Sequence, residues 1–99
     1  MILEVATLQV KPGEQQAFER AFSKAQAIIA SMSGYVSHEL KCCIERDNQY
    51  LLLVEWETLT DHTEGFRNSS QYQEWKALLH RFYEPAPTVY HYENVPGSA

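Results

Sequence analysis

The sequence predicts an α+β domain of the ferredoxin-like type, the split βαβ arrangement, with an antiparallel sheet covered by helices on one face. Segments with strand and helix periodicity follow one another in the order β-α-β-β-α-β, with the second helix broken in two. The chain has 99 residues, which is the length of one compact domain with a single core. A short polar turn between the two central strands also favours an antiparallel hairpin.

The first strand and the first helix are predicted from composition and spacing. Residues 1–10 are rich in β-forming side chains and end at Lys11-Pro12-Gly13, a turn that cannot continue a strand. Between residues 14 and 32 the large apolar side chains recur every three or four positions, which is typical of an amphipathic helix. Ser33-Gly34 then ends this helix.

A hairpin is predicted next. Residues 35–44 alternate, which places His38 on the apolar face and Tyr35 on the other. After the polar turn at 46–49, residues 50–56 form an almost unbroken apolar run, so we expect the two strands to pair.

The second helical region is predicted in two pieces. Thr58 and Asp61 have the spacing of a capping box, and so do Ser70 and Gln73. Each piece carries large side chains at helical spacing, which are Leu59, His62 and Phe66 in the first and Tyr72, Trp75, Leu79 and Phe82 in the second.

The C-terminal part is predicted to return to the sheet. Pro85 and Pro87 end the helix, and residues 88–95 form the last strand. We therefore expect a single domain over residues 1–95 and a frayed tail over residues 96–99.

The sheet face that the helices leave bare is predicted to be covered by a second copy of the chain. A face exposed to water should be polar at alternate positions, yet the third strand is apolar at every position from Leu51 to Val54. With no residues left to cover this face, we expect a homodimer that packs sheet to sheet about a twofold axis.

Charge and composition exclude several classes of partner. The net charge is −5, without a run of basic residues, which argues against binding to nucleic acid. No stretch reaches the roughly 20 apolar residues of a membrane span, and the N-terminus lacks the pattern of a signal peptide, so we expect a cytoplasmic protein. The adjacent Cys42 and Cys43 cannot staple the fold, which fits a reducing compartment.

No cofactor is expected. The histidines, cysteines and carboxylates lack the spacing of a metal site, so we expect no metal. The glycines are scattered and form no GxGxxG, Walker-type or GxSxG motif, which argues against a nucleotide cofactor.

Aromatic and titratable side chains concentrate between residues 56 and 83, which predicts a pocket between the sheet and the C-terminal helices. The alternative is that Trp56, Phe66, Tyr72 and Trp75 simply form the core of a small domain, because an aromatic stripe at helical spacing is more often core.

Histidine is the side chain whose ordinary pKa lies closest to neutral pH, so each of the four histidines is a candidate proton carrier. His62 is favoured, and His38 is either functional or a hydrogen-bonded core residue. We expect His80, near a helix C-terminus, to be structural, and His91 to face solvent or a dimer partner.

Four stretches of the chain together resemble the antibiotic biosynthesis monooxygenase family, whose members are dimeric ferredoxin-like α+β barrels. They are Lys11-Pro12-Gly13, Ser33-Gly34-Tyr35, the segment YLLLVEWETLTDHTEGFRNSSQY from Tyr50 to Tyr72, and PTVYHY from Pro87 to Tyr92. The family's His-x-x-Ser-x-x-Phe pattern falls on residues 66–72, where Phe66 stands in place of the usual histidine.

Members that oxidise anthrones without a cofactor use a strand Asn, a Trp, a Tyr and an Arg. The resemblance places these on Leu52, Trp56, His62 and Lys76, so that only the tryptophan is retained. His62 still offers a proton donor or acceptor, Lys76 keeps a positive charge, and Leu52 cannot replace an amide.

Haem-degrading members use an Asn, a Trp and a His. The corresponding positions are Ala6, Gly65 and Trp75 or Lys76, so all three are missing and haem degradation is not expected.

The resemblance implies a homodimeric, cofactor-independent monooxygenase or oxidase that acts on a small electron-rich aromatic substrate, anthrone-like or quinol-like, with O₂. In this interpretation His62 transfers the proton, Trp56 shapes the pocket by stacking, Lys76 steadies the anion, and His38 is a second pocket histidine. The substrate pocket would be lined by Phe66, Tyr72, Trp75 and Leu52. The alternative left open is a non-catalytic dimeric protein that binds a small molecule in the same cavity.

Overall fold

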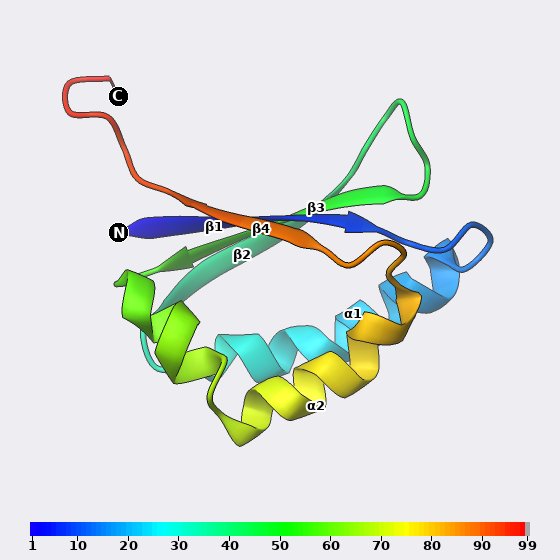
Figure 1. Cartoon of the computed structure of the whole chain (residues 1–99), viewed down its shortest axis with the longest axis horizontal. Coiled ribbons are helices and arrows are strands. Elements are labelled where there is room, and N and C mark those ends of the chain that lie inside the picture. The colour runs from blue at the N-terminus through cyan, green and yellow to red at the C-terminus, as the bar shows by residue number, and fades with distance from the viewer. Residues whose placement is uncertain (99) are drawn as a thin grey trace.

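The computed structural model describes residues 1–98 and shows one antiparallel sheet with all helices on the same face (Figure 1). The strand order is β2-β3-β1-β4, which confirms the predicted ferredoxin-like α+β fold. The elements are β1 (Ile2–Gln9), α1 (Gln15–Ala30), β2 (Tyr35–Cys42), β3 (Gln49–Trp56), η1 (Asp61–Phe66), α2 (Ser70–Leu79), η2 (His80–Phe82) and β4 (Thr88–Tyr92).

The core lies between the sheet and the helices. Alternate residues of β1 and β3 face the helices, because side chains along a strand point to opposite faces. These residues are Glu4, Ala6 and Leu8 in β1 and Tyr50, Leu52, Val54 and Trp56 in β3, all of them buried. The first helix buries its predicted apolar stripe of Phe18, Ala21, Phe22, Ala25 and Ile29 against them.

A bulge changes the predicted face of one residue in β2. The pairing to β3 shifts between Tyr35 and Ser37, so an extra residue is inserted and the alternation is interrupted. Simple alternation predicts Tyr35 on the face opposite His38. Tyr35 instead packs against the core, and its hydroxyl lies 2.6 Å from His38 Nδ1, while Val36 is exposed.

The first piece of the second helical region is a π-helical turn, η1. The reciprocal bonds of the predicted capping box are present between Thr58 and Asp61. His62 and Phe66 are buried, but Leu59 is 44% exposed. The prediction that Leu59 shares the face of His62 and Phe66 is therefore wrong. Hydrogen bonds of the i to i+5 type, such as Arg67 N–H to the His62 carbonyl, widen the turn and rotate Leu59 away.

The second piece, α2, is capped one residue earlier than predicted. The Ser69 hydroxyl accepts a hydrogen bond from Tyr72 N–H at 3.1 Å, so Ser69 rather than Ser70 is the N-cap. Helix α2 places Trp75 and Leu79 in the core, and the single turn η2 adds Phe82.

The last strand is shorter than predicted. Strand β4 pairs with β1 from Thr88 to Tyr92, and Tyr92 lies opposite Leu3, so only the first two residues of the chain lie beyond the last pair. Residues 96–98 of the expected tail are exposed, and Ala99 lies outside the described residues. None of the helices in residues 1–98 is long and apolar enough to cross a membrane. Cys42 and Cys43 are both free thiols.

The outer face of the sheet carries no helix, as Figure 1 shows. Its centre is apolar, since Val5 of β1 lies between Leu53 of β3 and Tyr90 of β4. Tyr90 and Tyr92 are 62% and 53% exposed. The sequence predicts that this face is too apolar to be exposed to water. In the single chain no other element covers it.

The turn that leads into β2 depends on Gly34. Its φ of +82° is in the region that side chains disfavour, and its carbonyl accepts a hydrogen bond from Glu57 N–H at 2.8 Å. A Cβ at this position would overlap the side chain of Asp61, which is held by Thr58. Gly34 thus lets the start of β2 lie against the start of η1.

We predict that Gly34→Ala destabilises the fold more than Gly13→Ala does. Both glycines have positive φ, but nothing lies within 4 Å of a Cβ at Gly13. The conformational cost alone is about 1 to 2 kcal/mol, and overlap with Asp61 adds about 1 to 3 kcal/mol at Gly34. Urea unfolding measures both, and equal losses in the two variants would contradict the proposed close approach.

Candidate active site

A pocket of about 180 Å³ lies between the inner face of the sheet and the helices. Its floor includes Ala6, whose small side chain pairs with Leu52 on one side and Val89 on the other and so leaves space at the centre of the sheet. The remaining lining residues are Glu4, Leu8, Ile29, His62, Phe66, Arg67, Tyr72, Trp75, His80, Tyr83 and Pro87. The pocket is therefore lined by both aromatic and aliphatic side chains, with Glu4, His62, Arg67 and His80 as charged or ionisable groups.

The only buried polar or charged residues among those described are Glu4 and His62, and they are in contact. Glu4 Oε1 accepts a hydrogen bond from Trp56 Nε1–H at 3.0 Å and lies 3.4 Å from His62 Nε2. The indole of Trp56 stacks on the imidazole of His62, with ring centres 5.4 Å apart and an angle of 22° between the planes. Trp56 thus fixes both titratable groups.

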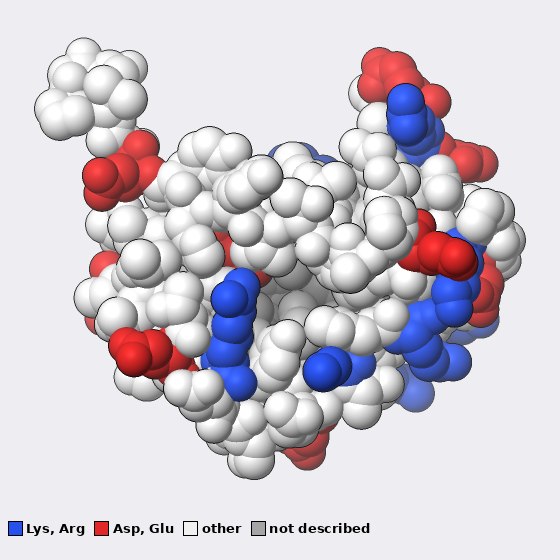
Figure 2. All heavy atoms as spheres, viewed as in Figure 1, with Lys and Arg blue, Asp and Glu red and all other residues white. Residues whose placement is uncertain are grey.

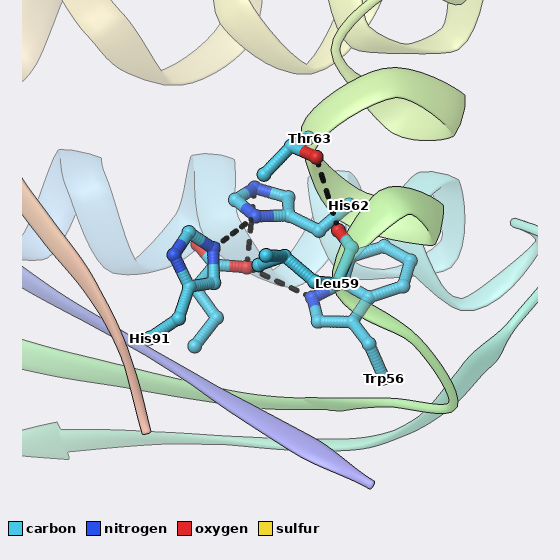
Figure 3. A network of polar contacts seen from close by, with 6 residues as sticks. Trp56, Leu59, His62, Thr63 and His91 are labelled. Carbon is cyan, nitrogen blue, oxygen red and sulfur yellow. Dashed lines mark hydrogen bonds and ion pairs between the residues drawn. The ribbon is translucent and has the colours of Figure 1, made fainter. Parts of the chain in front are cut away.

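His91 extends this network toward the outside. His91 Nε2 lies 2.8 Å from His62 Nδ1, and Figure 3 shows the two rings pointing toward each other beside Trp56. Strand pairing explains the position, because His91 of β4 is directly opposite Glu4 of β1 on the inner face. His91 is only partly buried, so the chain from Glu4 through His62 to His91 runs from the pocket to the surface.

Burial sets the protonation of these groups. Burial raises the pKa of Glu4, although the Trp56 hydrogen bond and the Arg67 charge act in the opposite direction. Burial, aided by the charges of Arg67 and His91, lowers the pKa of His62 to about 3. The pKa of His91 is lowered by burial and by Arg67. Both histidines are neutral at pH 7, so each ring can donate through one nitrogen and accept through the other.

A neutral pair has one arrangement that suits the carboxylate. If His91 donates its Nε2–H to His62 Nδ1, the remaining proton of His62 is on Nε2, beside Glu4 Oε1. The protonated Nε2 atom then lies 3.4 Å from Glu4 Oε1, so the three side chains form a line of contacts from the pocket to the partly exposed His91.

The structure brings together most of the residues expected at the site. Five of the predicted residues line the pocket: His62, Phe66, Tyr72, Trp75 and Leu52. Trp56 is fully buried behind His62 and acts on the pocket through this ring rather than by lining it.

Two of the expected residues lie outside the pocket. His38 is partly buried on the edge strand β2, where Nε2 contacts the Gln26 side chain of α1 at 3.0 Å, because the inner face of β2 meets α1 rather than the pocket. This matches the hydrogen-bonded role that the sequence left open. Lys76 is exposed on α2 and does not line the pocket, but its charge helps to lower the pKa of His80, which does line it.

Sequence reasoning missed Glu4, His91 and Arg67. Glu4 and His91 have a local signal, because each occupies the inner-facing position of a strand whose neighbouring inner residues are apolar. His91 lies on the inner face of β4, where it contacts His62 and stays partly exposed to solvent, and alternation alone does not say which face of β4 is inside. Arg67 has no comparable signal in the sequence.

The described residues contain no cluster of three or more histidine, cysteine or carboxylate side chains placed to hold a metal. At the pocket, the contacts of His62 with Glu4 and His91 can serve proton transfer, and the aromatic side chains can contact a ring.

Comparison with known proteins identifies the family. The family model for antibiotic biosynthesis monooxygenases matches residues 1–78. The chain belongs to the antibiotic biosynthesis monooxygenase family. This confirms the resemblance drawn from the sequence.

The similarity to individual proteins covers almost the whole chain. The uncharacterized protein YczJ of Bacillus subtilis (strain 168) is 61% identical over 95 residues, covering 96% of this chain and 100% of YczJ. A Bordetella bronchiseptica structure described as a candidate antibiotic biosynthesis monooxygenase is 33% identical with a TM-score of 0.91, covering 95% of this chain and 96% of that one. A mutant of SnoaB, a cofactor-independent oxygenase from Streptomyces nogalater, is 18% identical with a TM-score of 0.79. The match covers 96% of each chain, and SnoaB shares the fold.

We predict that His62 makes the native state sensitive to acid. The ordinary histidine pKa is 6.5 in the unfolded chain and the folded value is about 3, so between these pH values only the unfolded state takes up the proton. The free energy of unfolding therefore falls as pH decreases, by roughly 1 kcal/mol per pH unit from this group. His62→Phe, which keeps a ring on Trp56, should flatten the dependence measured by urea unfolding between pH 7 and pH 4.

The partly buried His80 serves as the control for this prediction. Its pKa is lowered by burial and by Lys76, but it is more exposed than His62, so His80→Gln should flatten the curve less. Parallel curves for the native chain and His62→Phe would show that His62 is not held neutral by the fold.

Proposed function

We propose that this protein is a cofactor-independent monooxygenase or oxidase that acts on a small electron-rich aromatic compound, anthrone-like or quinol-like, with O₂. The observation that carries the proposal is the aromatic pocket with a buried carboxylate and two coupled histidines at its end. Membership of the family supports it, and SnoaB is an example of a protein of this fold that is a cofactor-independent oxygenase.

The size of the pocket narrows the substrate. A cavity of about 180 Å³ is slightly larger than the roughly 150 Å³ cavity that holds benzene, and smaller than the pockets of about 300 Å³ or more that hold drug-sized ligands. We therefore favour a compound with one or two rings, which is closer to a quinol than to a three-ring anthrone.

The reaction needs a base and a site that favours an anion. For an activated ring CH₂ group, loss of a proton gives a carbanion, which passes one electron to O₂. The two radicals then combine as a peroxide. After protonation the peroxide loses water, so that one oxygen atom becomes the product carbonyl and the other leaves as water. A quinol instead gives up two electrons and two protons and yields a quinone and hydrogen peroxide.

Within this scheme Glu4 accepts the proton and His62 moves it onward. A base works best when its pKa lies near the working pH, and burial shifts the pKa of Glu4 toward neutrality but that of His62 away from it. The sequence interpretation makes His62 the group that takes the proton from the substrate. Because His62 lies between Glu4 and His91, we propose instead that it passes on a proton that Glu4 has accepted. Trp56 holds both groups in place, and Lys76 adds positive charge near His80.

We further propose that the active protein is a homodimer joined through the outer face of the sheet. The patch around Val5, Leu53 and Tyr90 is apolar and lies at the centre of an uncovered sheet. Large exposed apolar patches on small domains commonly mark interfaces between proteins.

The alternative function is a dimeric binding protein that keeps the cavity without the oxidation. Such a protein would be stabilised by quinols or related aromatic compounds through mass action and would consume no O₂ above the uncatalysed rate.

Oxygen uptake with a panel of quinols, catechols and anthrones tests the enzymatic proposal. We expect Glu4→Gln and His62→Ala to lower the rate by roughly 10²- to 10⁴-fold, the usual contribution of general acid–base catalysis. Trp56→Phe should affect the proton step more than substrate binding, because Trp56 does not line the pocket and the change removes the N–H that holds Glu4.

Glu74→Gln is the matched control, because Glu74 is exposed on α2 and does not line the pocket. Raised melting temperatures without O₂ uptake would favour the binding protein. Uptake that is unchanged in both Glu4→Gln and His62→Ala would remove these residues from the mechanism.

Sedimentation at micromolar concentration tests the assembly. We expect a dimer for the native chain and a monomer for Leu53→Glu, which places a charge at the centre of the outer face. Ala27→Glu on the exposed side of α1 is the control and should remain dimeric. A native chain that stays monomeric at all concentrations would exclude the sheet-to-sheet dimer.

A further inference from the structure

The pocket is bordered by an arginine that forms no ion pair with the acidic residues described in the structure. Arg67 follows η1, is exposed, and lines the pocket. Within residues 1–98, the ion pairs closer than 4.0 Å join Lys41 to Glu39 and His62 to Glu4, and neither involves Arg67. In a chain with 13 acidic and 8 basic residues, a guanidinium at this pocket without an ion pair among residues 1–98 is unexpected.

The charge of Arg67 acts on the interior of the pocket. It lowers the pKa of Glu4, His62 and His91, which come from β1, η1 and β4 and meet at one end of the cavity. Arg67 also lines the pocket, so a positive charge borders the cavity close to these groups.

A second cation lies near the same opening. Lys76 of α2 is close enough to lower the pKa of His80, a lining residue. Figure 2 shows basic side chains bordering the hollow on this face of the molecule. The acidic residue that lines the pocket is Glu4, which is only 5% exposed.

We propose that the pocket binds an aromatic acid, with its ring among Phe66, Tyr72 and Trp75 and its anionic substituent at Arg67. A guanidinium binds a carboxylate through two parallel N–H donors, and a positive rim attracts such a ligand to a chain that is negative overall. The inference takes from the proposed function only that the ring is oxidisable. Binding of the acid does not depend on oxidation.

The Glu4 carboxylate also limits where the anionic group can lie. An anionic group beside Glu4 would be repelled, whereas the same group at Arg67 is attracted.

Matched pairs of ligands test this directly. Gentisate and gentisamide are one-ring quinols that differ in a negative charge, and a dihydroxynaphthoate and its amide extend the comparison to two rings. Calorimetry should show that the native protein binds the better-fitting acid at least about 10-fold more tightly than its amide, the size expected of a hydrogen bond to a charged group. Added salt should weaken binding of the acid and leave the amide unchanged.

The variants locate the effect. Arg67→Gln keeps a polar side chain of similar reach and removes the charge, so it should bring the acid-to-amide ratio close to one. Arg20→Gln on the exposed side of α1 removes the same charge away from the pocket and should leave the ratio unchanged. Urea unfolding of both variants checks that the fold is intact.

The results separate this proposal from the oxygenase proposal. Amides that bind as well as acids, a preference that persists in Arg67→Gln, or no binding of any of the four compounds at millimolar concentration would overturn the anion site. Binding of the acid through Arg67 without O₂ uptake would support the anion site and count against the oxygenase. If neutral quinols are oxidised faster than the acids and binding shows no preference for the acids, the oxygenase proposal is supported and the anion site is overturned.

Discussion

The buried carboxylate of Glu4 is the constraint that organises the site. A carboxylate removed from water is costly unless it is hydrogen-bonded or paired, often by several kcal/mol. Here the Trp56 N–H, the His62 ring and the Arg67 charge compensate for that cost, and they come from β3, η1 and the segment after it. Holding Glu4 in place therefore fixes the relative positions of the first strand, the third strand and the π-helical turn.

The cavity exists because small and large side chains are unevenly distributed over the core. Ala6 at the centre of the sheet leaves space, while Phe66, Tyr72 and Trp75 form a rigid wall, with the Phe66 ring 5.2 Å from Tyr72 and 5.8 Å from Trp75 in edge-to-face contact. The widened turn of η1 allows His62 and Phe66 to enter the core together. Rings held in this way lose little freedom on binding, which suits a planar ligand.

The border of the pocket is positively charged, although the chain as a whole carries a net negative charge. The protein is acidic, yet its pocket combines a neutral histidine pair, a carboxylate with a raised pKa and a cationic border. Such an environment favours an anion that forms from a bound aromatic compound and provides a route by which the released proton can leave. The family membership and the pocket chemistry are therefore consistent with each other, although they are independent observations.

Spacing along the chain was enough to predict the element order, the apolar stripes and the concentration of aromatic side chains, because helix and strand periodicity depends on residues that are close in sequence. It also indicated His62, a titratable ring on the first turns of the predicted helix, six residues after Trp56. Only the folded chain shows that Glu4 and His91 are neighbours. These residues lie near opposite ends of the sequence, and the pairing of β1 with β4 brings them together. The bulge in β2 and the position of His38 at α1 were likewise set by packing, for which a single sequence carries no local signal.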